Sequence, residues 1–287
     1  MKTIPKSKLA SAIHLSRSRL YYREKQPEKD AALACEIKLQ LEKHETYGHR
    51  RIAIALDRGK NSVLRVMKLF HLEPVRRKPK TLRKKADLNT PALGFPNRIE
   101  TMEVDRPDKA WAEDFTYIRF QGRFVYLATV IDIFTREVLS FALCHRHAAH
   151  LVLSALSSAL ASLRRPMVSH SDQGSEYRSE ERLNLLTRIG IKISMSRKAS
   201  PWEKPHQEGF YSQFKLDLGK MNRFETLGEL VEEVSQRIHD YNTSRIHSAL
   251  KMPPARFREQ FMINQPFPET QRSKQKVLDF MSQETGT

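Results

Sequence analysis

Three acidic residues stand in sequence settings suited to metal-dependent chemistry. Asp114 lies in WAEDFTYI, Asp172 in HSDQGSEY and Glu208 in PWEKPHQE, and 35 residues lie between the last two acids. Carboxylate oxygens suit Mg²⁺, and two such ions roughly 4 Å apart can activate an attacking oxygen and stabilise the leaving one. We therefore expect Asp114, Asp172 and Glu208 to be catalytic residues that hold two Mg²⁺ ions for cutting and joining DNA. Each acid alone is a weak signal, because acidic residues are common on protein surfaces.

The first two acids are expected at strands of one sheet. Residues 112–119 alternate in part and are rich in aromatic and β-branched residues, which predicts a strand around Asp114, although aspartate is depleted in strands. Asp172 follows a short apolar strand predicted at 167–170, at the carboxyl end where open α/β sheets place ligands. Gly174 then lets the backbone pass close to a phosphate or a metal.

The third acid is expected early in a helix at 205–218. Lys215 lies seven residues after Glu208, two turns along the same helix face, so a metal ligand and an amine for a DNA phosphate would share that face. A histidine beside an aspartate more often orients a neighbour than takes part in catalysis. Asp132, in a long apolar strand, is expected to make a structural hydrogen bond. Residues expected to support the site are His170, Gln173, Gly174 and Trp111.

The segment that holds these acids alternates between strand and helix patterns. The first three predicted strands follow one another across short turns, which favours an antiparallel meander. The order of elements describes an α/β fold with a mixed sheet and helices on its faces. Strands are predicted at 112–119, 124–133, 138–143, 167–170 and 191–195, and helices at 148–163, 180–189, 205–218 and 227–241.

Positive charge is concentrated in the first third of the chain. The 287 residues have a formal net charge of +17, and residues 1–100 hold 24 Lys and Arg against 10 Asp and Glu. Lys and Arg that neutralise phosphates release counterions, so a polyanion is the natural partner of this region. We expect it to bind nucleic acid; a basic surface that only keeps the protein soluble is the competing interpretation.

The basic region is predicted to be helical. Residues 6–24 fit two short helices, and an amphipathic helix is predicted at 28–43. A helix, a glycine-containing turn and a helix at 61–70 then follow the helix-turn-helix pattern, with Asn61 as the candidate N-cap. Residues expected to contact DNA are Arg17, Arg19, Arg50, Arg51, Arg65, Lys68, Arg76, Arg77 and Lys78.

Composition argues against membrane and zinc-finger proteins. No apolar run approaches the roughly 20 residues that span a bilayer, and no apolar core follows the first residues as in a secretory signal. Cys35 and Cys144 lie far apart and no Cys-x-x-Cys occurs, so a cysteine-based zinc site is not expected. A cytoplasmic protein is expected, with a helical DNA-binding region at 1–75, a basic linker at 76–100, a catalytic core at 101–262 and a tail at 263–287.

Together these motifs resemble the D-D-E transposases and integrases. More narrowly, they resemble the OrfB proteins of bacterial insertion sequences in the family named after insertion sequence 3. The resemblance covers nearly the whole chain: LSRSRLYY and YGHRRI resemble the family's N-terminal helices, and the three acid segments with Lys215 resemble its catalytic core. YNTSRIH, with Pro253 and Phe257 after it, resembles its C-terminal signature, in which Arg245 and His247 are further expected DNA contacts.

The resemblance implies an RNase H-like catalytic core preceded by a small all-helical domain of helix-turn-helix type. It also implies nicking at the ends of the element, dependent on Mg²⁺ or Mn²⁺, followed by attack of a 3′-hydroxyl on DNA. The implied partners are double-stranded DNA from the terminal inverted repeats and the target, an upstream OrfA protein or a fusion with it, and further copies of the chain. The implied location is the bacterial cytoplasm, on the nucleoid.

One segment departs from the family pattern. The family usually reads close to Pro-Tyr-Asp-Asn-Ala-x-x-Glu before the glutamate, whereas PWEKPHQE here lacks the asparagine. The departure supports an alternative, a catalytically degenerate DNA-binding or regulatory protein whose basic first third is the functional part. A third alternative is an RNase H-like nuclease that cuts but does not join; the helix-turn-helix pattern instead favours binding at specific DNA ends.

Overall fold

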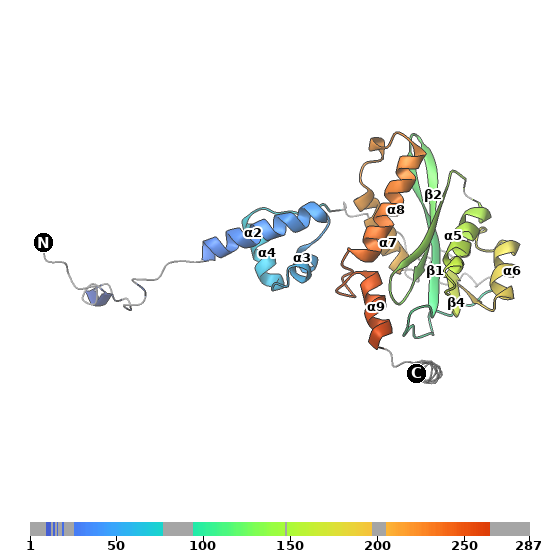
Figure 1. The fold of residues 1–287 in the computed structure, drawn as a ribbon, viewed down its shortest axis with the longest axis horizontal. Helices are drawn as coiled ribbons and strands as arrows, with labels where there is room; N and C mark the ends of the chain where they lie inside the picture. Colours follow the sequence, from blue (N-terminus) through green and yellow to red (C-terminus); the bar gives the residue numbers. More distant parts are fainter. Residues whose placement is uncertain are drawn as a thin grey trace, which may run out of the picture. The chain divides into compact units, whose positions relative to one another are not determined.

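The computed structural model describes two separate parts of the chain. They are compact units at Met1–Val75 and Arg76–Thr287 (Figure 1). Most of the predicted linker and tail, and most of residues 6–24, lie outside the described residues. Within the described part, no helix has the length and apolar character needed to cross a membrane. The described residues are 10–12, 14, 16, 19, 26–76, 94–146, 148–196 and 205–264.

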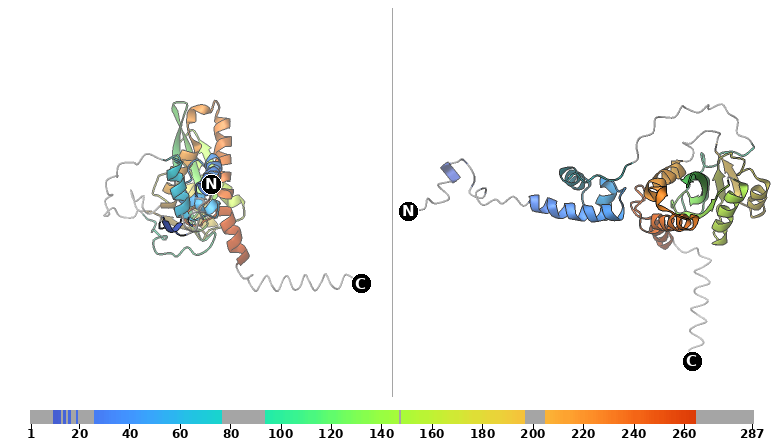
Figure 2. Two further views of the ribbon diagram at one scale, coloured as in Figure 1. Left: turned by 90° about the vertical axis from the view of Figure 1, so that its left-hand side faces the viewer. Right: turned by 90° about the horizontal axis from the view of Figure 1, so that it is seen from above.

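In the first unit, the described helices α2 (Gln26–Lys43), α3 (His49–Ala55) and α4 (Lys60–Leu69) pack against one another (Figure 2). The N-cap of α4 is Gly59, whose backbone is extended. The prediction of Asn61 as the cap is therefore wrong, since Asn61 lies inside the first turn. The core that closes the unit consists of Ala34, Ile37, Ile52, Ala53, Val63, Val66 and Met67.

The second unit is built on a five-stranded mixed sheet in the order β3-β2-β1-β4-β5. The first three strands form the predicted antiparallel meander, and β4 pairs parallel with both β1 and β5. The order of strands and helices predicted from the sequence is confirmed. The strands are β1 (Ala110–Phe120), β2 (Arg123–Asp132), β3 (Val138–Cys144), β4 (Val168–Ser171) and β5 (Lys192–Met195).

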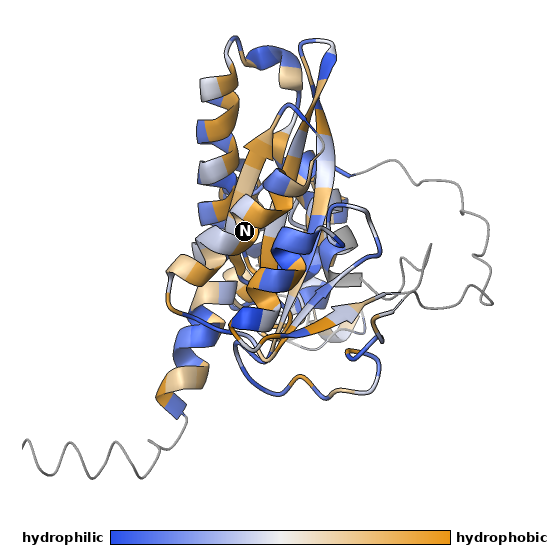
Figure 3. Ribbon diagram, turned by 90° about the vertical axis from the view of Figure 1, so that its right-hand side faces the viewer, coloured by the Kyte–Doolittle hydropathy of each residue, from blue (hydrophilic) through white to orange (hydrophobic). Residues whose placement is uncertain are grey.

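Helices cover both faces of the sheet. Figure 1 shows α5 (Ala149–Ala161) and α6 (Glu180–Arg188) on one side, and α7 (Pro205–Leu218) and α8 (Leu227–Thr243) on the other. Each side has its own apolar core, because successive side chains of a strand point to opposite faces. Hydrophobic residues accordingly run along the strands, while the helices carry both kinds (Figure 3). One core gathers Trp111, Leu156, Tyr177 and Leu186, and the other gathers Leu127, Phe210, Phe214 and Leu230.

Two elements are not predicted from the sequence. They are a short 3₁₀ helix at Met221–Arg223 and α9 (Pro254–Asn264). Proline suits the first turn of a helix, where its missing N–H is not needed. α9 contacts α8, and its Phe257 and Phe261 lie against the ring of Phe134, with centroids 5.5 and 4.9 Å away. Phe257 of the C-terminal signature therefore lies in a helix that packs against the rest of the second unit.

Candidate active site

Asp114 and Asp172 follow the paired segments of two neighbouring strands. β1 and β4 are parallel, and the last pair in their register is Ala112 with His170. Asp114 and Asp172 each lie two residues further along the chain, Asp114 within β1 and Asp172 in the loop directly after β4. Both are partly exposed, which leaves room for a ligand at this edge of the sheet.

A glycine fixes the orientation of the Asp172 carboxylate. The Gly174 amide donates a hydrogen bond of 2.8 Å to Asp172 Oδ1. A Cβ atom added at Gly174 would lie 2.9 Å from Asp172 Oδ1 and 2.9 Å from Glu176 Oε2, closer than such atoms pack. A larger residue at this position would therefore displace one or both carboxylates.

The pKa of the Tyr177 phenol responds to burial and to the charges of both carboxylates. Burial raises its pKa well above the ordinary value, and the negative charges of Asp114, Glu113 and Asp172 raise it further. The residue is fully buried in the core between the sheet and α6. Tyr177 is the last residue of the HSDQGSEY motif. Its electrostatic link to the acids was not predicted, because an aromatic residue at this position is typical of a hydrophobic core.

A buried ion pair holds the Asp172 loop against β1. Arg182 of α6 and Glu113 of β1 are 0% and 2% exposed at their side chains and approach to 2.8 Å. The same guanidinium donates to the Tyr177 carbonyl at 2.7 Å and to Ser169 Oγ at 3.1 Å. Strand β1, strand β4 and the loop after β4 are thereby tied together directly behind Asp114.

Helix α7 is fixed to β1 at the level of Asp114. The Tyr211 hydroxyl donates to the Asp114 carbonyl at 2.6 Å and lies 2.8 Å from Thr129 Oγ1. Glu208 lies three residues before Tyr211 in the first turns of α7, on the same helix face. The carboxylate of Glu208 itself lies outside the described side chains. Lys215, one turn after Tyr211, places its amine 4.7 Å from the centre of the Tyr117 ring.

The three predicted acids are therefore carried by elements that meet, although their carboxylates are not all described. Among the described side chains, no three His, Cys, Asp or Glu residues are arranged to hold a metal. That set contains Asp114 and Asp172 but lacks the side chain of Glu208. The triad stays a prediction, supported by backbone placement.

The predicted supporting residues have structural contacts. His170 is buried, and its Nδ1 lies 2.9 Å from Ser194 Oγ of β5, so it orients β4 against β5. Trp111 is buried and donates from Nε1 to Asp108 at 2.9 Å, as a core residue. The carboxamide of Gln173 is buried, with no hydrogen-bond partner for either atom in the described part of the chain.

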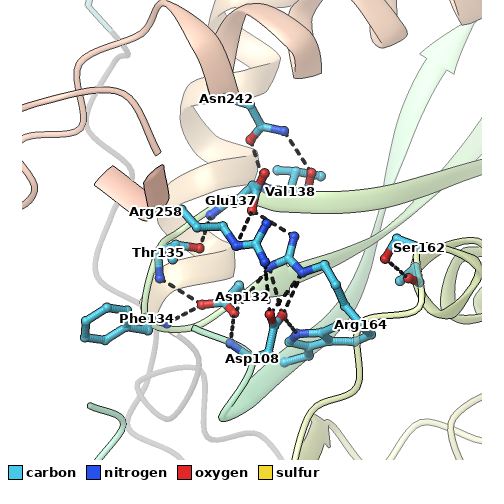
Figure 4. Close-up of polar contacts among 12 residues, drawn as sticks. Asp108, Asp132, Phe134, Thr135, Glu137, Val138, Ser162, Arg164, Asn242 and Arg258 are labelled. Atoms are coloured by element: carbon cyan, nitrogen blue, oxygen red, sulfur yellow. Dashed lines mark hydrogen bonds and ion pairs between the residues drawn. The ribbon is translucent and has the colours of Figure 1, made fainter. Parts of the chain in front are cut away.

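Asp132 has a structural role, as the sequence predicts. Its carboxylate is fully buried and accepts hydrogen bonds from the amides of Asp108, Phe134 and Thr135 at 2.6, 2.8 and 2.8 Å. Figure 4 shows these bonds closing the turn after β2. Burial raises the pKa of this carboxyl, while the amide bonds act in the opposite direction.

Comparisons with known proteins show the family of this chain. Residues 104–201 and 189–254 match two models that are each described as an integrase core domain. The putative transposase InsK for insertion sequence element IS150 of Escherichia coli (strain K12) is 32% identical over 269 residues, covering 89% of this chain and 94% of that protein. The transposase InsF for insertion sequence IS3A of the same strain is 31% identical, covering 59% of this chain and 61% of that protein. The chain belongs to the insertion-sequence-3 family of DDE transposases.

Its function is DNA transposition, and its second unit is an integrase core. A cryoEM structure of a simian T-cell lymphotropic virus intasome in complex with PP2A regulatory subunit B56 gamma matches with a TM-score of 0.49 and 18% identity, covering 81% of this chain and 76% of that chain. The transposase fold observed here, a mixed sheet with helices on both faces, is the α/β fold that the sequence predicts.

The residues of the transposase that were expected to contact DNA differ in their placement. Arg19, Arg50, Lys68 and Arg76 are exposed. Arg51 lies 5.8 Å from the centre of the Tyr47 ring. Arg17, Arg77 and Lys78 lie outside the described residues. The exposed arginine and lysine side chains are accessible to DNA, and their contact with DNA stays a prediction.

Three of the expected DNA contacts are engaged within the protein. Arg65 holds buried Asp30 through both terminal nitrogens, at 2.5 and 2.6 Å, and so joins α4 to α2 instead of simply facing outward. Arg245 is buried and forms an ion pair with Asp217 at 2.9 Å. His247 forms a β-bridge with Met252. In YNTSRIH, Arg245 is therefore buried within the protein, whereas His247 is partly exposed.

Proposed function

We propose that this transposase nicks DNA at the ends of its element and joins the resulting 3′-hydroxyl to target DNA, with Mg²⁺ held by Asp114, Asp172 and Glu208. One observation carries the proposal. β1 and β4 pair in parallel up to Ala112 and His170, two residues before Asp114 and Asp172, and the Tyr211 hydrogen bond holds α7, the helix of Glu208, against the Asp114 backbone. These contacts support a common site for three acids that lie far apart in the sequence.

The residues present fit a hard divalent cation. Asp114 and Asp172 supply carboxylate oxygens from partly exposed positions, and the Gly174 amide engages Oδ1 of Asp172 in a cradle that a Cβ atom would fill. Oxygen-only donors suit Mg²⁺ and Mn²⁺ more than softer metals. A bound divalent ion supplies Lewis-acid stabilisation and lowers the pKa of an attacking hydroxyl.

The chain's own groups position the DNA. Lys215 lies on the same face of α7 as Tyr211, where its ammonium can pair with a phosphate near the acids. The exposed Arg50 and Lys68 of the helical unit would hold the terminal repeats by contacts to phosphates, which set position and not sequence. The predicted partners are an upstream OrfA protein and further copies of the chain on DNA, in the bacterial cytoplasm.

The decisive experiment uses purified full chain, DNA carrying the ends of its own element, and MgCl₂. Asp172→Asn is expected to lower strand transfer by about 1,000-fold, because a bound metal stabilises the transition state by several kcal/mol. Glu180→Gln, an exposed acid at the start of α6, is the matched control and should keep wild-type activity. Binding of DNA by both variants, measured by anisotropy, should stay within about twofold because neither residue is a cation.

Each alternative has its own outcome. Undiminished strand transfer by Asp172→Asn contradicts the proposal. A wild-type chain that binds DNA but shows no heat of Mg²⁺ binding by calorimetry supports the degenerate regulator. Cleavage of the ends without any joined product, at saturating target DNA, supports the nuclease.

A further inference from the structure

β1 and β2 continue well past the end of β4 and close as a hairpin (Figure 1). β4 pairs only with residues 110–112 of β1, and β3 pairs with β2 only as far as Tyr126, opposite Tyr117, so the segment between there and the turn is two-stranded. The turn is the two-residue Gln121-Gly122, with φ of 46° and 77°, as a type I′ turn requires. Gln121 donates to the Glu225 carbonyl at 2.6 Å, which braces the turn against the segment after α7. The two-stranded part of the hairpin begins at Tyr117, three residues after Asp114, and ends at this turn.

The hairpin exposes two aromatic rings. Tyr117 is 57% and Phe124 is 49% exposed, and their ring centroids are 5.1 Å apart in an edge-to-face contact. In the register Tyr117 faces Tyr126 and Arg119 faces Phe124, so the exposed pair lies diagonally across the two strands. Two exposed aromatic rings in contact form an apolar platform, which a soluble protein rarely leaves without a ligand.

Cations surround this platform. Arg119 and Arg123 are exposed on the same hairpin, and neither makes an ion pair with any residue in the described ranges. The Lys215 amine lies over the Tyr117 ring at 4.7 Å. We call Tyr117, Arg119, Arg123, Phe124 and Lys215 the hairpin patch. Its charge excludes a basic partner, and its rings offer what a nucleobase needs for stacking.

We propose that the hairpin patch binds an unpaired nucleotide of the DNA substrate, with the base on the Tyr117–Phe124 platform and the phosphates on Arg119, Arg123 and Lys215. Tyr117 is three residues after Asp114, roughly 10 Å along a strand, which is about three nucleotide steps of B-form DNA. The patch would therefore hold a nucleotide that has left the duplex close to the cleaved bond. That the nucleotide belongs to the DNA being cleaved rests on the proposed function. Binding of an unpaired base to the hairpin patch does not.

The test compares two DNA probes on the full-length protein. One is a blunt duplex, and the other is the same duplex with a single-stranded 3′ extension of about three thymidines, matching the distance from Asp114 to Tyr117. Because the basic first third is expected to bind any duplex, the readout is the ratio of the two dissociation constants. A second readout is the fluorescence of 2-aminopurine in the extension, which falls when the base stacks.

Tyr117→Leu and Phe124→Leu keep apolar side chains on the hairpin but remove the rings. Each is expected to weaken binding of the extended duplex by about tenfold and to abolish the 2-aminopurine quenching, while the Kd for the blunt duplex changes less than about twofold. Arg119→Ala should weaken binding of the extended duplex and reduce its salt dependence. The matched controls, Arg188→Ala for an exposed arginine and Leu163→Ala for an exposed apolar residue, should change neither probe.

Three outcomes overturn the proposal. The first is a ratio of dissociation constants that both ring variants leave unchanged. The second is equal weakening of blunt and extended DNA. The third is loss of self-association in sedimentation with DNA binding intact, which would assign the patch to a second copy of the chain. Asp172→Asn separates this test from the proposed function, since it should quench 2-aminopurine like wild type even though it does not join DNA.

Discussion

Two groups of acids on the same sheet have opposite environments. Asp132 and Asp114 lie on neighbouring antiparallel strands, where Asp132 pairs with Trp111 and Asp114 pairs with Thr129 in the register. Asp132 is completely buried and accepts hydrogen bonds from three backbone amides. Asp114 is partly exposed and lies two residues past the last pair of β1 with β4. A distance of three residues in the register thus separates an acid that holds the fold from one available for chemistry.

The residues around Asp132 are joined by ion pairs and hydrogen bonds. Arg164 bridges Asp108 at 2.8 Å and Glu137 at 3.0 Å, and Arg258 of α9 reaches Asp108 at 3.3 Å (Figure 4). Asn242 of α8 exchanges two hydrogen bonds with the Val138 backbone, at 2.9 and 2.8 Å. Buried Asp132 and the partly buried Asp108 and Glu137, with these partners, fix the turn after β2, the loop before β4 and the C-terminal helices in one arrangement.

The contrast between Asp114 and Asp132 is tested most directly by removing the charge of each in turn. Asp114→Asn should lower strand transfer by about 1,000-fold through loss of a metal ligand, with little change in the free energy of unfolding. Asp132→Asn should instead lower the free energy of unfolding by about 1–2 kcal/mol, because its NH₂ group would face the Asp108 amide, donor against donor. Relief of burying a charge limits that loss, as the raised pKa of Asp132 indicates.

The measurements are urea unfolding followed by circular dichroism, and strand transfer per mole of folded protein. Activity that falls by the same factor in both variants would remove the distinction between the two acids. A loss of stability in Asp114→Asn as large as in Asp132→Asn would do the same.

A smaller effect is expected from the glycine beside Asp172. In Gly174→Ala the new methyl group would lie 2.9 Å from Asp172 Oδ1, so the carboxylate must turn away and lose its 2.8 Å bond from the Gly174 amide. Displacement of a positioned group by about 1 Å costs about 100-fold in rate. Strand transfer should fall by about that factor, and a higher Mg²⁺ concentration should be needed for half-maximal activity. Gly190→Ala would be a poor control, since Gly190 has φ of 76°; Gly48→Ala, with open space around it, is the suitable one.

The order of the sheet and helices in the second unit followed from periodicity because its strands and helices alternate strongly in pattern. The contrast between Asp114 and Asp132 did not follow with the same certainty, because both stand in strand-like sequence. Only the register shows that one lies two residues past the last pair with β4 and the other beneath a turn. Local pattern carries no information on which distant segment becomes the neighbour.

The same limit applies to two arginines that were expected to contact DNA. Arg65 is exposed, as expected of a surface cation, but it also holds Asp30, whereas Arg245 is buried. Their partners, Asp30 and Asp217, lie 35 and 28 positions earlier in the chain and were not identifiable as such. Tyr211 was missed for a related reason: a helix pattern predicts that it is buried, but not that its hydroxyl reaches the Asp114 carbonyl.

The smallest effect concerns the phenol of Tyr177. The pKa of Tyr177 in the folded protein is raised, by burial first and then by neighbouring acids including Asp114 and Asp172. In the unfolded chain the phenol ionises near its usual pKa of about 10, so below that pH its contribution to stability is complete. Above it, the unfolded state loses the proton while the folded state keeps it, and the free energy of unfolding falls.

Tyr177→Phe lacks this proton, so its stability should decline less than that of the wild type between about pH 10 and 11. Parallel urea titrations at pH 9 and above measure the difference, and equal slopes for the two proteins would contradict a raised pKa of Tyr177 in the folded state.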